Sequence, residues 1–323
     1  MLFYMIITPM YMLSIIMSIS SYSWMMIWIG MEMNLIIFII YNIKSMNVFS
    51  TESSMKYFLI QSLGSLIFII SLIVNIFLYE EWPNMYMYSI PLAMMLKSGL
   101  APLHSWTPLV ISSMSEINIF MFLTMQKIIP LMICFCSWME MLMLTSVINV
   151  IMGAIGGVTQ SSLIKMLIFS SLNNSAWMIM SMTESYTLFI FYFMCYSLMT
   201  MLIISMMFKS QTKWMIQVKK MMLKEKMSWY LIMLSMSGLP PFLGFFPKWL
   251  VLYGMFFYMP YFSMIFILSS VFTMFFYMKN SFSMLFMNEM NMKMNIYYMK
   301  FNMLNKTLIT INCSGMIMFY ILT

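Results

Sequence analysis

Long apolar runs, each about the length of a membrane-crossing helix, follow one another along almost the whole chain. Short polar connections at 42–55, 80–85, 209–227 and 280–304 separate groups of them. Since a helix needs about 20 apolar residues to cross a bilayer, we mark about eleven spans. They lie near 3–20, 22–41, 56–79, 86–107, 115–137, 140–158, 163–181, 186–208, 228–258, 260–279 and 305–323. The pattern predicts an all-α polytopic membrane protein.

The fourth and ninth spans are interrupted by one shared pattern of glycine and proline. The segments read SGLAPLHSWTP at 98–108 and SGLPPFLGFFP at 237–247. Proline removes a backbone donor and clashes with the preceding turn, so each copy is expected to break its helix. Five spans separate the copies, so they enter the membrane from opposite sides, as inverted repeats of transporters do. We predict one membrane domain, 1–323, made of two inverted five-helix repeats (about 3–137 and 140–279) and a C-terminal helix (about 305–323).

The composition supports the membrane assignment. Hydrophobic residues make up 63% of the chain, charged residues 8%, and the mean hydropathy is +0.91. A soluble domain carries about 25% charged residues, so this chain is too apolar to cover a surface in water. All basic residues are lysine, all acidic residues are glutamate, and methionine reaches 52. This bias is typical of an AT-rich organelle genome. The N-terminus resembles neither a typical signal peptide nor a transit peptide, and a protein made inside its organelle needs neither.

Lysine placement predicts the orientation, because Lys and Arg collect on the cytoplasmic or matrix side. The loops after odd-numbered spans hold glutamate and no lysine: Glu80, Glu81, Glu140 and Glu184. The lysines outside spans or at their ends follow even-numbered spans: 44, 56, 165, 209, 213, 219, 220, 224, 226, 279, 293, 300 and 306. This places the N-terminus inside and the C-terminus outside. It also accounts for the net charge of +7 without any nucleic-acid partner.

Four charged side chains fall within apolar spans: Glu32, Lys97, Lys127 and Lys248. A charge at the bilayer centre costs at least about 2.5 kcal/mol, so such residues usually serve function. Burial and pairing shift the protonation equilibria of such groups, which suits them to a proton path. His104, in the first broken segment, is a possible intermediate carrier. The alternatives are lysines that snorkel to a span end, a structural Glu–Lys pair, and a histidine that only packs.

Redox cofactors are not indicated within the chain. The four cysteines, Cys134, Cys136, Cys195 and Cys313, form no metal-binding spacing and are interpreted as small apolar side chains. A single histidine argues against paired haem ligation. No Gly-rich dinucleotide fingerprint is present, so we expect no NADH site.

Several segments resemble the subunit 2 family of mitochondrial NADH dehydrogenase, an antiporter-like part of the membrane arm of respiratory complex I. They are WIGMEMN at 28–34, LKSGLAPLHSW at 96–106, LTMQK at 123–127, GAIGGVTQSSLIKMLIFSSLNNSAWM at 153–178 and SGLPPFLGFFPKW at 237–249. The match covers most of the chain in order. The absence of Arg and the excess of Met resemble an insect version, and animal forms keep about eleven helices, the number that the bilayer thickness indicates here.

The resemblance implies a mid-membrane proton path. It implies that Glu32 pairs with Lys97 of the first broken helix, that Lys127 is the next carrier and that Lys248 belongs to the second broken helix. It also implies a place in the mitochondrial inner membrane, with the N-terminus in the matrix and the C-terminus in the intermembrane space. The implied partners are other membrane-arm subunits, neighbouring antiporter-like subunits among them, and phospholipids. NADH, FMN, iron–sulfur clusters and ubiquinone are expected in partner subunits.

Two positions depart from the family pattern. Asn174 stands where the family often has His, and asparagine carries no proton in this range. Leu109 follows Pro108 where the family often has Glu. Lys165 matches a family lysine and is either an uptake-side group or a topology lysine. If the family's His is a relay, its step here must run through water or another residue.

Three functions compete at this stage. The leading hypothesis is a proton-translocating subunit of NADH:ubiquinone oxidoreductase. The alternative is a stand-alone cation/proton antiporter of the same fold, which purification without a large assembly would favour. The third is a structural membrane spacer, in which apolar residues could replace all the intramembrane charges.

Overall fold

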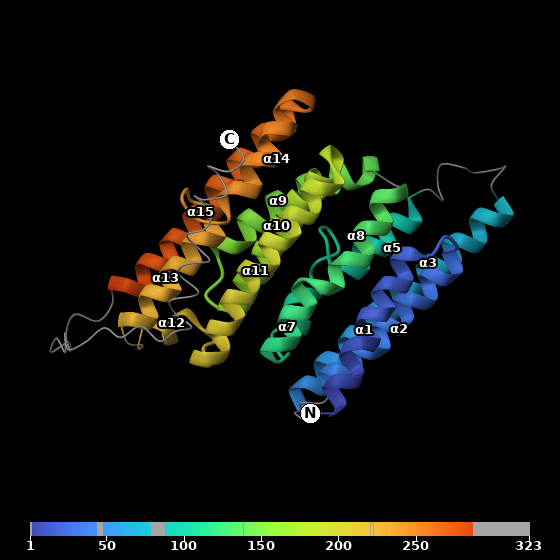
Figure 1. The fold of residues 1–323 in the computed structure, drawn as a ribbon, viewed down its shortest axis with the longest axis horizontal. Helices are drawn as coiled ribbons and strands as arrows, with labels where there is room; N and C mark the ends of the chain where they lie inside the picture. The colour runs from blue at the N-terminus through green and yellow to red at the C-terminus, as the bar shows by residue number, and fades with distance from the viewer. Residues whose placement is uncertain are drawn as a thin grey trace. The chain divides into compact units, whose positions relative to one another are not determined.

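The structure is a computed structural model that describes residues 2–43, 48–78, 88–137, 139–219, 221 and 223–286. The chain divides into two compact units, Met1–Thr145 and Ser146–Thr323. The first unit contains α1 (Leu2–Ser20), α2 (Trp24–Ile43), α3 (Val48–Leu78), α5 (Ser89–Ser98), α6 (Thr107–Ile111), α7 (Glu116–Leu123) and α8 (Met125–Ser137) (Figure 1). Helix α9 (Met139–Val158) runs from the first unit into the second. The second continues with α10 (Leu163–Glu184), α11 (Tyr186–Ser210), α12 (Met215–Val218), α13 (Leu223–Ser237), α14 (Phe245–Tyr258) and α15 (Pro260–Phe286).

Six helical stretches among the described residues are long and apolar enough to cross a membrane. They are Trp24–Ile43, Val48–Val74, Glu116–Phe135, Glu140–Val158, Tyr186–Ser210 and Pro260–Ser283. Helix α3 exposes Leu59, Leu63, Leu66 and Ile70 at helical spacing. Such an apolar outer stripe suits contact with lipid and not with water. The described chain is thus an all-helical membrane protein, as the apolar pattern predicts.

The first unit packs its helices in sequence. Helix α1 lies against α2, α2 against α3, and α3 against α5, as Figure 1 also shows. A Cβ at Gly30 of α2 would lie 2.9 Å from the Ser18 Cβ of α1, so the absence of a side chain permits the close approach. An aromatic cluster from α2, α3, α7 and the broken segment fills the centre of the unit: Phe38, Tyr57, Trp106 and Phe122.

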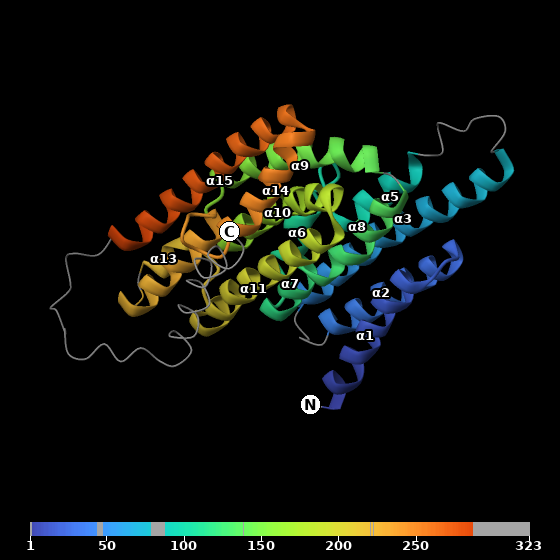
Figure 2. The ribbon, with the colours of Figure 1, turned by 45° about the horizontal axis from the view of Figure 1, so that its top comes forward.

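Helix α10 is the buried helix of the second unit, because every side chain from Ser170 to Met182 is covered. Helices α11 and α14 pack against it, and α13 packs against α15 (Figure 2). A Cβ at Gly153 of α9 would lie 2.8 Å from the Asn173 backbone nitrogen, so glycine lets α9 approach α10 closely. The Trp177 ring meets Phe266 of α15 edge-on, with centroids 4.9 Å apart. Helix α14, which follows the second broken segment, therefore packs against a buried helix.

Both predicted breaks are present, and they share their backbone geometry. Helix α5 ends at Ser98 and α13 ends at Ser237, one residue before a glycine in each case. Gly99 has φ +66° and Gly238 has φ +80°, a conformation that favours glycine because it lacks a Cβ. After Gly99, the Leu100 N–H donates to the Met95 carbonyl at 3.0 Å and closes the helix end. The shared sequence pattern thus produces a shared local structure.

Other details of the prediction change. The fifth span is divided into α7 and α8 at Thr124, a turn residue with φ −111° and ψ −75°. Lys226, which we placed outside the spans, lies inside α13 with 1% of its surface exposed. The ninth span begins earlier than its apolar run, at Leu223, because helix propensity and packing extend the helix beyond the hydrophobic residues. The span at 305–323 lies outside the described residues, and the total of eleven helices and the inversion of the repeats stay predictions.

Candidate functional site

Lys97 lies in the last turn of α5, where the helix is about to break, and its side chain is buried. Its Nζ is 3.9 Å from Glu32 Oε1 on α2, an ion-pair distance, and 3.8 Å from the Met31 Sδ. The Glu32 side chain is 25% exposed, so the ion pair is not fully buried. The expected Glu32–Lys97 pair is therefore present, while its part in proton transfer stays a prediction.

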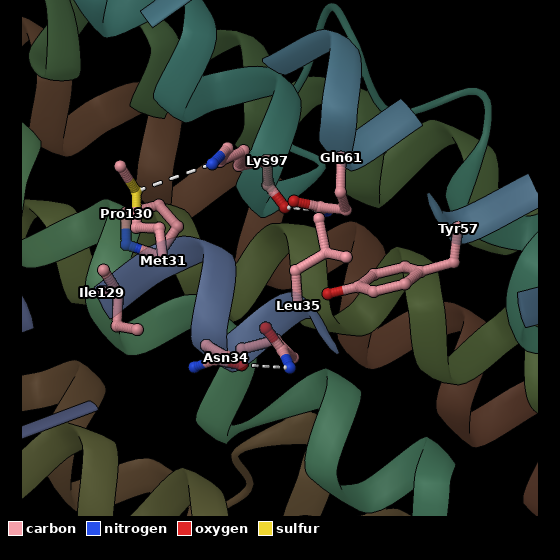
Figure 3. Close-up of a pocket in the computed structure, with 9 residues that line it drawn as sticks. Met31, Asn34, Leu35, Tyr57, Gln61, Lys97, Ile129 and Pro130 are labelled. Carbon is pink, nitrogen blue, oxygen red and sulfur yellow. Dashed lines mark hydrogen bonds between the residues drawn. The ribbon is translucent and has the colours of Figure 1, made fainter. Parts of the chain in front are cut away.

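Helix α3 provides the space and a fixed anchor for Lys97. A Cβ at Gly64 would lie 2.9 Å from the Lys97 Cγ, so any larger residue there would displace the lysine stem. The Gln61 side-chain amide donates to the Lys97 carbonyl at 2.9 Å, and this bond satisfies one of the carbonyls left free at the helix end (Figure 3). Sequence reasoning missed both residues, because neither is charged.

A small cavity of about 20 Å³ lies beside this pair. It is lined by Met31, Asn34, Leu35, Tyr57, Gln61, Lys97, Gln126, Ile129 and Pro130, which Figure 3 shows as sticks. This volume holds one water molecule, which needs at least about 10–15 Å³. The Asn34 Nδ2 is buried and donates to nothing within the described residues. A buried donor beside a water-sized space is a suitable binding position for water.

Lys127 lies on α8, just after the Thr124 break, and only 3% of its surface is exposed. Its backbone N–H donates to the Thr124 carbonyl at 3.2 Å, so the break sets where its helix begins. The neighbouring Gln126 donates to Asn34 Oδ1 at 2.8 Å and lines the cavity beside Lys97. The same turn of α8 therefore carries both a cavity wall and the second buried lysine.

Lys248 lies on α14, after the second break, and is buried. Its Nζ donates to the carbonyl of Ser237 at 3.3 Å. Ser237 is the last residue of α13. Helix C-termini carry partial negative charge, so this position favours an ammonium group. A Cβ at Gly238 would lie 3.1 Å from the Nζ, so glycine leaves room for it. The second unit thus holds its lysine against a helix end instead of a carboxylate.

His104, Asn174, Lys165 and Leu109 lie in different surroundings. His104 is half-buried in the broken segment, and its carbonyl accepts from the Thr107 N–H at 3.1 Å. Asn174 is buried in α10 and its Oδ1 accepts from the Tyr192 hydroxyl at 3.1 Å. Lys165 and Leu109 are exposed, which suits a topology role for the lysine.

Comparison with known proteins adds an independent finding. The family model for the membrane part of NADH:quinone oxidoreductases and Mrp antiporters matches residues 21–273, most of the chain. The chain belongs to this family. Within it, the chain is 37% identical to NADH-ubiquinone oxidoreductase chain 2 of Anopheles gambiae over 73% of its own length and 72% of that protein. It is 38% identical to the same chain of Locusta migratoria, over 73% and 71% of the two lengths.

Solved structures show the same antiporter-like fold. A chain in the structure of respiratory complex I from Thermus thermophilus with bound aureothin superimposes with a TM-score of 0.79. The superposition covers 98% of this chain and 78% of the other, at 17% identity. At that identity the likeness speaks for the fold, while the chain 2 relatives carry the family assignment.

Proposed function

We propose that this protein is a core membrane subunit of proton-pumping NADH:ubiquinone oxidoreductase, complex I. It contributes a mid-membrane Glu/Lys proton path to respiratory electron transport. The sequence contains no Gly-rich dinucleotide fingerprint and no metal-binding cysteine spacing, so in this proposal the oxidoreductase chemistry belongs to partner subunits that carry FMN, iron–sulfur clusters and ubiquinone. Its family membership and the chain 2 relatives support the assignment.

The observation that carries this function is the Glu32–Lys97 pair beside a water-sized cavity at a helix break. The two charges of an ion pair stabilise each other, so a change in their separation favours the transfer of a proton. The broken helix gives the lysine a position where a small shift of the backbone changes that distance. The cavity, which Lys97 lines, offers room for a water molecule.

The path continues, in this proposal, through Lys127 and Lys248, with His104 as an intermediate carrier. Two inverted repeats, about 3–137 and 140–279, each supply one broken helix. The N-terminus faces the matrix and the C-terminus the intermembrane space of the inner membrane, because the lysine-bearing loops then lie on the matrix side. Partners are the other membrane-arm subunits, neighbouring antiporter-like subunits and phospholipids.

Replacing Lys97 by Met (K97M) in the assembled complex tests this function. A positioned proton-transfer group contributes on the order of 100-fold to rate, so proton pumping and coupled turnover should fall by about that factor. The matched control is K56M, because Lys56 forms an exposed pair with Glu52 in the same unit. Pumping is measured by a pH-sensitive dye and assembly by native gel. Undiminished pumping in assembled K97M would contradict the proposed path.

A second candidate follows from the family model, which also includes Mrp antiporters. The structure of the Mrp complex from Dietzia superimposes with a TM-score of 0.71 over 85% of this chain. A stand-alone cation/proton antiporter would work without a redox assembly. Purification decides between them, since a chain that transports protons alone in vesicles, and is not recovered with a respiratory assembly, would favour the antiporter.

A further inference from the structure

Three uncharged polar side chains from three helices line the cavity beside Lys97. They are Asn34 of α2, Gln61 of α3 and Gln126 of α8, and we call them the cavity layer. Gln126 donates to Asn34 Oδ1 at 2.8 Å, and Gln61 donates to the Lys97 carbonyl at 2.9 Å. The Asn34 Nδ2 is buried and has no acceptor within the described residues. The cavity layer therefore offers a hydrogen-bonding place for the one water molecule that the space holds.

A second group of polar side chains lies near the ends of the same helices. Asn42 comes just before the end of α2, while Ser53 and Asn118 lie in the first turns of α3 and α7. The Asn42 Nδ2 donates to the Ser53 hydroxyl at 3.0 Å, and the Asn118 Nδ2 donates to Asn42 Oδ1 at 2.9 Å. We call these three buried residues the helix-end layer. In the predicted orientation the loops next to them face the matrix, so this layer lies on the matrix side of the cavity.

Aromatic rings separate the two polar layers. The rings of Phe38 and Tyr57 have centroids 4.9 Å apart, and that of Phe122 lies 6.4 Å from the first and 6.1 Å from the second. None of these three side chains is more than 3% exposed. Tyr57 also lines the cavity, so this aromatic layer closes the cavity on that side (Figure 3).

One spacing in the sequence produces all three layers. On α2, Phe38 lies four residues after Asn34 and four before Asn42. Tyr57 and Phe122 each lie four residues from a member of the cavity layer and four from a member of the helix-end layer. Residues four apart share a face of a helix and lie about 6 Å apart along its axis. An aromatic plug about one helical turn thick therefore divides the helix-end layer from the cavity.

The broken segment connects the aromatic layer to Lys97. Trp106 follows Lys97 by nine residues, and its ring centroid lies 5.7 Å from that of Phe122 and 6.3 Å from that of Tyr57. A Cβ at Gly99 would lie 3.4 Å from the Trp106 ring, so the turn that ends α5 lies against the same ring. A shift of the broken segment that moves Lys97 would therefore also change the packing of the aromatic layer.

Packed apolar rings exclude water, and a hydrophobic constriction conducts only when it becomes wet. We propose that Phe38, Tyr57 and Phe122 form a closed gate between the matrix water and the cavity beside Lys97. This inference rests on the proposed function and extends it to the route of proton uptake. When the broken segment shifts, Trp106 loosens the rings, water joins the helix-end layer to the cavity layer, and a proton reaches Lys97.

The test is Phe122→Asn (F122N) in the assembled complex, with Phe68→Asn (F68N) as the matched control. Phe68 is a buried ring of α3 in the same unit, but it packs against Trp24 and lies outside the three layers. An amide in the gate should keep it wet, so that protons slip back to the matrix and fewer are pumped per NADH oxidised. F68N should keep the normal ratio, and so should Phe122→Leu (F122L), which leaves the gate apolar.

Met31 provides a direct measure of water in the cavity. It lines the cavity and is only 5% exposed. Radiolysis of water produces hydroxyl radicals that oxidise a nearby methionine to its sulfoxide, which tandem mass spectrometry assigns to a residue. Oxidation of Met31 should rise in F122N and stay at the unmodified level in F68N and F122L. A loss of packing alone would not produce this dependence on the polarity of residue 122.

Both changes are required. Unchanged Met31 oxidation or an unchanged pumping ratio in assembled F122N would overturn the gate, as would equal changes in F68N. If F122N fails to assemble, Asn118→Leu (N118L) decides, because it removes an amide of the helix-end layer at nearly constant side-chain size. N118L should lose coupled turnover, and normal turnover of this variant would overturn the inference.

K97M keeps this test separate from the test of the proposed function. Normal pumping by K97M would contradict the proton path as a whole. Impaired pumping by K97M together with a normal F122N complex would contradict only the gate.

Discussion

The two broken segments use the same backbone device and surround their lysines differently. Each follows a helix that ends at serine, and each then turns through a glycine with positive φ. In the first unit Lys97 lies 3.9 Å from a carboxylate, whereas in the second Lys248 donates to the Ser237 carbonyl. The pattern of Gly and Pro therefore determines the break, and the helices packed around it determine the charge balance.

This difference bears on how the two lysines respond to change. A lysine paired with a carboxylate depends on that partner, and removing the partner leaves a buried charge. A lysine on a helix end depends on backbone dipoles, which no single substitution removes. The first site is suited to being switched by its neighbour, and the second to holding a lysine in a constant environment.

The largest effect in this comparison is expected for Glu32→Gln (E32Q). It should lower the free energy of unfolding of the first unit by about 3 kcal/mol. This is the lower end of the range for a broken buried ion pair, because Glu32 is 25% exposed. The double variant E32Q/K97M should recover part of the loss, with a coupling of about 1–3 kcal/mol. Thermal inactivation and native-gel abundance of the complex measure both. Additive losses in the double variant would show that the two side chains are not coupled.

Lys248→Met serves as the comparison for the E32Q/K97M double variant. Combined with K97M, it should give additive losses, because Lys97 contacts the Glu32 carboxylate and Lys248 contacts the Ser237 carbonyl. A coupling as large as that of Glu32 with Lys97 would break the distinction between the two sites.

An intermediate effect is expected at the two turn glycines. Alanine at 99 or 238 should each cost about 1–2 kcal/mol, because both have positive φ. Gly99→Ala should be worse, since its Cβ would overlap the Thr107 methyl group. At 238 the Cβ would lie 3.1 Å from the end of the flexible Lys248 side chain. Inactivation temperatures of the two variants should differ in that order, and the reverse order would argue against the described geometry.

The smallest effect is expected at the buried contact between Tyr192 and Asn174. Tyr192→Phe removes the hydroxyl that donates to Asn174 and should cost about 1 kcal/mol. The control is Tyr253→Phe, because Tyr253 is 62% exposed. If Asn174 takes part in proton transfer only by holding water, Tyr192→Phe should leave pumping almost unchanged. A large loss of pumping without loss of stability would place the Tyr192–Asn174 contact on the path.

Much of the fold could be predicted because it depends on local signals. Lipid requires long apolar helices, so their positions follow from hydropathy. The breaks follow from Gly and Pro, whose backbone preferences act within a few residues. The turn at Thr124 carries no such signal, because residues 116–129 contain neither Gly nor Pro.

Of the residues at the candidate sites, only the charged ones could be predicted from the sequence. Glu32, Lys97, Lys127 and Lys248 stand out against apolar spans, and the family resemblance gave them roles. Gly64, Gln61 and the Asn34–Gln126 contact escaped notice, since small and uncharged residues are common in helices. Lys226 and Glu184 looked like loop charges, and only packing shows that one is buried and the other half-buried.

The sequence by itself determined that this protein is a helical membrane protein, where two of its helices break and which charges enter its spans. These are properties of residue type and of spacing over one or two turns. The family resemblance implied that Lys97 meets Glu32, while the tertiary structure alone decided that Lys248 meets a helix end and that Gln126 of α8 meets Asn34 of α2. Such pairings join residues far apart in the chain, and helix packing selects them through shape, which the order of apolar residues does not encode.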